Sequence, residues 1–304
     1  MLSRTLVLKI AEQPAFKNWI KHSRLTQGLI RRFIAGEDLE TALRITRQLN
    51  QEGFLVALDY LGEDTRREED ANYAAEQYIT LLEQIHKNGV NSCISIKLTQ
   101  LGLDLGDAIA RRNLEKVIIA AREFNNFVWV DMESSKHTQA ILDLFCELYP
   151  RYPHSGTVLQ SYLYRTPQDL ERLIALGARI RLVKGAYAEP KEVAYPDKRS
   201  VDRQFKIQME MLLEKGNEPA IATHDTRLIS HAKHHAAELG LSRTQFEFQL
   251  LYGISRELQK RLVAEGYRTL IYVPYGEQWY PYFSRRLAER PANLYFILRS
   301  LFRK

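Results

Sequence analysis

The segment NSCISIKL, residues 91–98, decides how the rest of the chain is interpreted. Side chains alternate between the two faces of an extended strand, so Ile94 and Ile96 share one face while Ser95 and Lys97 share the other. Strands that helices cover on both sides of an open parallel sheet are instead apolar on both faces. The alternation therefore predicts a strand with one apolar face and one face that lines a polar interior.

Seven further segments have the composition of short buried strands, and helical patterns separate them. The eight predicted strands cover residues 54–59, 91–98, 127–132, 157–161, 179–184, 220–224, 246–251 and 269–274. The predicted helices between them cover residues 74–87, 107–124, 135–149, 167–176, 203–215, 226–239 and 255–265. Eight strands with helical crossovers favour an α/β fold of the (β/α)8 TIM-barrel type over a doubly wound open sheet, which uses fewer strands.

Residues 12–50 precede the first predicted strand and show helical spacing of apolar residues such as Trp19 and Ile20. We therefore expect extra N-terminal helices in a segment spanning residues 1–50, followed by a catalytic barrel spanning residues 51–304. A length of 304 residues is compatible with a single barrel of this class.

The composition predicts a globular, cytoplasmic protein. Hydrophobic residues make up 45% and charged residues 26% of the chain, which excludes a disordered chain. Its apolar runs are far shorter than the ~20 residues that span a bilayer, and its first residues lack a signal-peptide pattern. The net charge of +6 favours anionic partners. No basic tail or zinc-finger spacing accompanies it, so we do not expect nucleic-acid binding.

Cysteine and histidine spacing gives no metal site. Cys93 and Cys146 lack a CxxC partner, which predicts two buried thiols and neither a disulfide scaffold nor a thiolate zinc site. His231, His234 and His235 form an HxxHH pattern on a predicted helix. Because no carboxylate stands at the spacing of a zinc protease, the pattern favours a solvated helix face over a metal site.

The predicted barrel has a polar interior. The residues that face it include Ser95, Lys97, Asp131, Gln160, Arg181, Glu247 and Gln249. Lys97, Asp131 and Gln160 fall near the carboxyl ends of their strands, where the active sites of barrel enzymes lie. The sequence therefore predicts a polar site at that mouth of the barrel.

A helix predicted directly after the eighth strand carries Tyr282, Arg285, Arg286 and Glu289 on one face, at positions i, i+3, i+4 and i+7. One interpretation is a solvated face with an Arg285–Glu289 surface pair. The other is a pair of guanidiniums at the barrel mouth that binds a small carboxylate or phosphate in a bidentate manner.

Two lysines end predicted strands and leave alternatives open. Lys97 or Lys184 at a barrel rim can form a Schiff base, which would make the protein a lyase. Alternatively, Lys97 is a cation near Asp131 and Lys184 contacts a cofactor, or both form structural ion pairs. A non-catalytic basic binding module is the third hypothesis.

Five segments, in this order along the chain, resemble the proline dehydrogenase family: IKLTQLG (96–102), RLVKGAY (181–187), ATHD (222–225), FEFQLLYGI (246–254) and YVPYGEQWYPYFSRRLAERPAN (272–293). The resemblance implies a (β/α)8 barrel that binds FAD and oxidises L-proline to Δ1-pyrroline-5-carboxylate, the first step of proline catabolism to glutamate. It points to the monofunctional bacterial form, because the chain lacks an aldehyde dehydrogenase portion and a DNA-binding arm. The product would then pass to a separate pyrroline-5-carboxylate dehydrogenase.

The resemblance also implies roles for individual residues. Lys97, Arg285 and Arg286 would hold the proline carboxylate, while the substrate ring would be lined by Tyr282, Tyr272 and Leu251. Asp131 would hold Lys97, and Glu289 would pair with an arginine. The catalytic set is thus Lys97, Asp131, Tyr272, Tyr282, Arg285, Arg286 and Glu289. The FAD-binding set is Gln160, Arg181, Lys184, Gly185, Ala186, Thr223 and His224.

The reaction that the resemblance implies transfers a hydride from proline C5 to flavin N5, which needs orientation but no protein nucleophile. The chain has no haem, iron–sulfur or dinucleotide motif, so an external quinone is the expected electron acceptor. Basic apolar segments at 29–33 and 298–304 suit peripheral contact with the inner face of the cytoplasmic membrane. The sequence leaves a homo-oligomer open.

Overall fold

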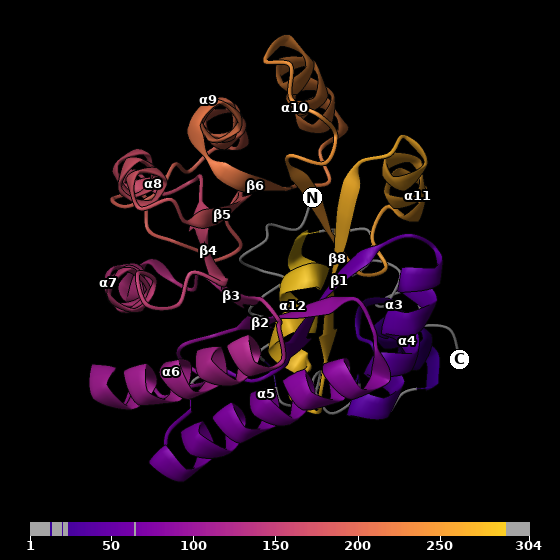
Figure 1. Cartoon of the computed structure of the whole chain (residues 1–304), viewed down its shortest axis with the longest axis vertical. Coiled ribbons are helices and arrows are strands. Elements are labelled where there is room, and N and C mark those ends of the chain that lie inside the picture. The colour runs from indigo at the N-terminus through magenta and orange to yellow at the C-terminus, as the bar shows by residue number, and fades with distance from the viewer. Residues whose placement is uncertain (1–12, 14–19, 21–23, 64, 290–304) are drawn as a thin grey trace.

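In the computed structural model, eight parallel strands form a closed barrel in the order β1 to β8, and β8 pairs with β1 to close it. The structure describes residues 13, 20, 24–63 and 65–289, without the side chains of residues 24–27, 29 and 287–289. Helices surround the ring of strands (Figure 1). The predicted (β/α)8 barrel with extra N-terminal helices is confirmed.

The strands are β1 (Leu55–Tyr60), β2 (Ser92–Ile96), β3 (Val128–Val130), β4 (Ser155–Gln160), β5 (Arg179–Val183), β6 (Asn217–Ala222), β7 (Glu247–Leu251) and β8 (Arg268–Tyr275). The helices are α3 (Arg24–Phe33), α4 (Leu39–Gln51), α5 (Glu68–Asn88), α6 (Asp107–Glu123), α7 (Ser135–Leu148), α8 (Thr166–Ala175), α9 (Lys198–Lys215), α10 (Thr226–Glu238), α11 (Arg256–Ala264) and α12 (Tyr280–Glu289). Most predicted boundaries differ from these by a few residues.

The strand ends matter for the site. The sixth strand was expected at 220–224, but β6 ends at Ala222, so Thr223 and His224 lie in the loop that follows. Lys97 and Asp131 likewise stand directly after β2 and β3 rather than inside them. At the carboxyl mouth of a barrel the chain leaves the ladder to reach the next helix, which frees these side chains to point into a pocket.

The main hydrophobic core fills the layer between the strands and the surrounding helices. On β2, Ile94 and Ile96 point into this layer and are fully buried, as the alternation in the sequence predicts. They belong to one continuous cluster with Tyr78, Leu81 and Leu82 of α5. Burying each such side chain contributes about 1.5–3 kcal/mol, and this layer leaves the strand faces that point inward free to be polar.

A second hydrophobic cluster lies at the mouth of the barrel and includes α12. Its buried members are Ile20, Ile30, Phe33, Ile34, Leu61, Ile254, Trp279, Tyr280, Tyr282 and Phe283, and Leu251 and Tyr272 pack against it. The rings of Phe33 on α3 and Phe283 on α12 are 6.4 Å apart. In Figure 1, α12 is seen within the ring that the strands outline. The N-terminal helix α3 therefore supports the helix that follows the last strand.

The two cysteines lie in different parts of the fold. Cys93 and Cys146 are free, but both residues are only partly buried, so the expectation of two buried thiols was wrong. Cys93 faces the interior near the open amino end of the barrel, and Cys146 lies on the outer layer of helices, where solvent reaches it.

On α10, His234 is exposed and pairs with Glu238, as expected for a solvated face. His231 and His235 are partly buried and pair with glutamates of α9, so the expectation of a solvated face was wrong for these two. The described residues contain no group of three ligands that fits a metal ion. Within the same part of the chain, no helix is long and apolar enough to cross a membrane.

Gly253, in the loop after β7, allows the close approach of α3. A Cβ at this position would lie 1.7 Å from the carbonyl oxygen of Arg32, and its φ is +71°. Arg32 Nε also donates to the Gly253 carbonyl oxygen at 3.1 Å. The loop after β7 and the end of α3 therefore fit together through the absence of a side chain.

We predict that Gly253→Ala destabilises the protein more than Gly240→Ala, measured as the free energy of unfolding in urea. Gly240 has nearly the same φ, +70°, but a Cβ there meets no atom within 4 Å. Backbone strain alone should therefore cost about 1 kcal/mol at Gly240, and the clash with α3 should add about 1–3 kcal/mol at Gly253. Equal losses in the two variants would show that α3 does not pack on this loop.

Candidate active site

Lys97 lies between two carboxylates at the carboxyl mouth of the barrel. Its Nζ donates to Asp59 Oδ1 at 2.9 Å and lies 3.6 Å from Asp131 Oδ2. Tyr272 on β8 donates its hydroxyl proton to Asp131 Oδ2 at 2.7 Å and lies 3.4 Å from Lys97 Nζ. Strands β1, β2 and β8 and the end of β3 thus bring four polar side chains to one point.

The two carboxylates keep Lys97 charged. Burial by itself lowers the pKa of the Lys97 ammonium, but attraction to Asp59 and Asp131 outweighs it and holds the pKa above its ordinary value. A Schiff-base lysine has to present a free amine. The surroundings of Lys97 therefore suit a fixed cation better than a nucleophile.

Arg181 on β5 occupies the centre of the lumen below this cluster. Its Nη1 donates to Asp131 Oδ1 at 2.8 Å and to Ser95 Oγ at 3.0 Å. Its guanidinium carbon lies 4.5 Å from the centre of the Trp129 ring and 5.4 Å from that of Tyr272. Among the described residues, its buried Nη2 has no hydrogen-bond partner. One strong donor thus remains for a bound group.

Helix α12 brings the arginines to the same mouth. Arg285 binds both carboxylate oxygens of Glu63, with Nη1 3.0 Å from Oε2, and its guanidinium lies 5.6 Å from the Tyr187 ring. Arg286 is buried, and its guanidinium lies 5.2 Å from the ring of the buried Tyr282. The alternative of a solvated helix face is therefore wrong for these residues.

Glu63 is the carboxylate that the structure places against an arginine of α12. The sequence had suggested Glu289 for this role, but the side chain of Glu289 lies outside the described residues. Burial by itself raises the pKa of Glu63, whereas the Arg285 guanidinium outweighs it and lowers the pKa below the ordinary value. The Arg285–Glu63 pair therefore remains ionised at neutral pH.

The residues expected to bind the cofactor lie at the end of β4, on β5, and in the loops after β5 and β6. Gln160 Nε2 donates to the Glu133 carbonyl oxygen at 2.8 Å, and His224 Nε2 accepts from the Leu251 backbone N–H at 3.1 Å. Gly185, with φ +117°, lets the chain approach the Tyr162 ring, which a Cβ would meet at 2.5 Å. Thr223 and Ala186 are in the same loops.

Lys184, which follows β5, forms two ion pairs. Its Nζ donates to Asp202 Oδ1 at 2.6 Å and to Asp225 Oδ2 at 3.0 Å, so its ammonium already has two carboxylate partners from α9 and the start of α10. The structure thus shows the ion pair that the sequence left open as one alternative for Lys184.

Three acidic residues of this mouth were missed from the sequence: Asp59, Glu63 and Glu133. Asp59 ends the inward face of β1 and could have been found by the alternation that located Lys97. Glu133 accepts from the Thr99 backbone N–H at 3.0 Å, and Glu63 reaches Arg285 across the mouth. The last two lie in loops, where no periodic pattern marks them.

A closed parallel barrel with buried, paired charges at the carboxyl ends of its strands defines an enzyme of the TIM-barrel class. The sequence profile of the family described as proline dehydrogenase matches residues 42–299. The chain belongs to the proline dehydrogenase family, and it is therefore an oxidoreductase of proline catabolism.

Similar proteins support the same assignment. The chain is 42% identical over 274 residues to "Proline dehydrogenase 1" of Bacillus subtilis, covering 90% of this chain and 91% of that protein. It is 40% identical to "Proline dehydrogenase" of Deinococcus radiodurans, covering 99% of this chain and 98% of that protein. A crystal structure of proline utilization A from Bdellovibrio bacteriovorus, inactivated by N-propargylglycine, matches with a TM-score of 0.83 at 27% identity, over 95% of this chain and 36% of that chain.

The Glu63 carboxylate should make the free energy of unfolding depend on pH in the acidic range. Because its folded pKa is lowered, its stabilising effect is complete above its ordinary pKa of 4.5 and is lost as the pH falls through the folded value. We expect Glu63→Gln to lower the free energy of unfolding by about 2 kcal/mol near neutral pH, and less in acid.

Urea unfolding of both proteins between about pH 7 and about pH 3.5 measures this difference. Asp70→Asn is the control, because Asp70 forms an exposed pair with Arg67 and should change stability little. A Glu63→Gln difference that stays constant across this pH range would contradict the prediction.

Proposed function

We propose that the protein uses FAD to oxidise L-proline to Δ1-pyrroline-5-carboxylate, the first step of proline catabolism to glutamate. Membership of the proline dehydrogenase family supports proline as the substrate. The observation that carries the proposal is that two buried cations lie against Asp131: Lys97 at 3.6 Å at the barrel mouth, and Arg181 at 2.8 Å below it.

The residues of the lumen fit a flavin. Among the side chains that the structure describes, Arg181 Nη2 and Ser161 Oγ are buried without a hydrogen-bond partner. A flavin ring presents nitrogen and oxygen acceptors that such donors can satisfy. Arg181, Gln160, Lys184, Gly185, Ala186, Thr223 and His224 would hold the cofactor. When bound, FAD supplies the hydride acceptor, its N5 atom, for the hydrogen on proline C5.

Three cations would orient the substrate. Lys97, Arg285 and Arg286 bind the proline carboxylate. A guanidinium has five N–H donors, and in the described contacts Nη1 and Nη2 of Arg285 each donate one to Glu63. Fixing one end of the substrate at three points pre-organises its ring for reaction. The clamp also restricts the substrate to small amino acids.

Aromatic and aliphatic side chains would complete the pocket. Tyr282, Tyr272 and Leu251 pack against the ring of the substrate, and Tyr272 is oriented by its hydrogen bond to Asp131. Asp131 thereby positions Lys97 and Tyr272 together, and burial and nearby carboxylates keep the pKa of the Tyr272 phenol well above its usual value. The phenol remains a neutral hydrogen-bond donor at neutral pH.

The reaction needs an electron acceptor and an enzyme that consumes its product. An external quinone takes the electrons, and a separate pyrroline-5-carboxylate dehydrogenase takes the product. The protein is cytoplasmic and touches the inner face of the membrane through basic segments. Arg31 and Arg32 of α3 are exposed, whereas residues 298–304 lie outside the described residues. The chain divides into a helical segment at residues 1–50 and a catalytic barrel at residues 51–304.

The purified protein is expected to be yellow or to become so when FAD is added, and anaerobic L-proline should bleach the flavin absorbance. Absorption spectroscopy measures both steps. A folded protein that takes up no FAD would refute the proposal. A borohydride-trapped covalent adduct of a carbonyl substrate on Lys97 or Lys184 would favour the lyase instead.

Arg286→Met is predicted to raise the KM for proline about ten- to a hundredfold, because it removes one charge-assisted contact to the carboxylate. Steady-state kinetics with a soluble quinone, together with flavin content, measure this effect. Arg172→Met is the control: it removes an exposed guanidinium on the outer helix α8, where Arg172 pairs with Asp143, and should leave the KM unchanged. A normal KM in Arg286→Met would show that the arginine has only a packing role against Tyr282.

A further inference from the structure

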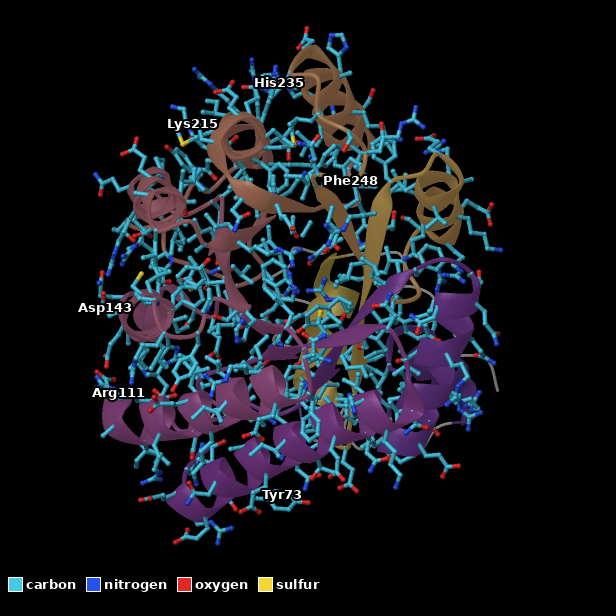
Figure 2. All side chains as sticks on the ribbon, in the orientation of Figure 1. Tyr73, Arg111, Asp143, Lys215, His235 and Phe248 are labelled. Atoms are coloured by element: carbon cyan, nitrogen blue, oxygen red, sulfur yellow. The ribbon has the colours of Figure 1, made fainter. Side chains whose placement is uncertain are left out.

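A chain of hydrogen-bonded side chains runs down the lumen beneath Arg181. Glu247 begins β7 and Gln249 follows on the same inward face. Gln249 Nε2 donates to Glu247 Oε1 at 2.6 Å, and Gln249 Oε1 accepts from Arg181 Nε. Glu247, Gln249 and Arg181 are 2%, 3% and 3% exposed, so solvent cannot replace these contacts. Figure 2 shows how densely side chains fill the interior of the barrel.

The chemistry of the three groups permits one arrangement. A guanidinium offers only donors, and a carboxylate offers only acceptors. The Gln249 amide has one group of each kind, so its oxygen has to face Arg181 and its nitrogen has to face Glu247. Arg181 and the carboxylate of Glu247 therefore select the same orientation of the amide, and Glu247 holds its nitrogen end in place.

This arrangement fixes the Arg181 guanidinium at two edges. Asp131 and Ser95 bind Nη1 from one side, and Gln249 binds Nε from the other. With a contact at a single edge, the planar group can tilt about that contact. With both edges held, the position of Nη2, which has no hydrogen-bond partner in the described part of the chain, is set.

We propose that Glu247 and Gln249 are positioning residues for Arg181. Glu247 acts through Gln249 to hold the guanidinium so that Nη2 is presented to the group that occupies the pocket. The inference rests on the proposed function, in which that group is the flavin. A fixed positive group beside a flavin strengthens its binding and raises its reduction potential by stabilising added negative charge.

A purely structural role for Glu247 would look different. Its Oε2 lies 3.6 Å from Arg268 Nη2, at the amino end of the barrel. Arg268 is partly exposed and also lies 3.3 Å from Glu218. If Glu247 served only that ion pair, its replacement would change stability and leave the flavin unaffected.

The test compares Glu247→Met, which removes the acceptor, with Glu247→Gln, which keeps an acceptor oxygen in the same place. We expect Glu247→Met to weaken FAD binding by the apoprotein about tenfold and to shift the flavin midpoint potential to more negative values. Glu247→Gln should retain FAD affinity within about twofold. Glu218→Gln is the matched control, because Glu218 also pairs with Arg268 at the amino end of the barrel but makes no contact with Gln249 or Arg181 in the described hydrogen bonds. This variant should bind FAD normally.

A second measurement does not depend on flavin. The Nε–H signal of Arg181 in a proton–nitrogen NMR spectrum of the apoprotein is assigned by its loss in Arg181→Lys. This signal should move and exchange faster with solvent in Glu247→Met, and stay in place in Glu218→Gln. If the wild-type protein binds no FAD, the proposed function fails, and the signal still tests the positioning role.

Unchanged FAD affinity, midpoint potential and Arg181 signal in Glu247→Met would overturn the inference. So would equal losses in Glu247→Met and Glu218→Gln, which would indicate a general effect on the barrel end. If Glu247→Met does not fold, Gln249→Met removes the acceptor of Arg181 Nε directly. The same measurements on that variant then support or overturn the inference.

Discussion

The charges buried in the barrel lumen are the constraint on which the rest of the structure depends. Asp59, Lys97, Asp131, Arg181 and Glu247 are each less than a tenth exposed. Removing such groups from water costs several kcal/mol for each ion unless opposite charges and hydrogen bonds compensate. Strand register satisfies this requirement. It sets Asp59 of β1 against Lys97 after β2, Asp131 after β3 against Arg181 of β5, and Glu247 of β7 against Arg268 of β8.

The mouth of the barrel is built from parts of the chain that are distant in sequence. The Glu63–Arg285 pair joins residues 222 positions apart, and α3 supports α12 through the contact of Phe33 with Phe283. Because α12 carries Tyr282, Arg285 and Arg286, the packing of α3 against α12 affects the site. The cluster at the mouth is separate from the main core between the strands and the surrounding helices.

Much of the fold and part of the site could be predicted from local patterns. Alternation on β2 located Lys97, and the same rule placed Arg181 and Gln249 in the lumen. Asp59 follows the same rule and was overlooked. Glu63 could not be found in this way, because a loop has no periodicity and its partner lies on α12. The two carboxylates that hold Lys184 come from α9 and the start of α10, which only folding brings together.

By itself, the sequence determined the barrel class, the polar lumen and the residue types at the carboxyl mouth. Strand periodicity and motif order are properties of the sequence itself, and they can be identified without knowing which residues contact each other in the folded protein. Only the tertiary structure decided the pairing: Lys97 with Asp59, Arg285 with Glu63, and Arg181 with Gln249 and Glu247. The physical reason is that ionic and hydrogen-bond partners are selected by distance and direction in space, which the closing of the barrel sets.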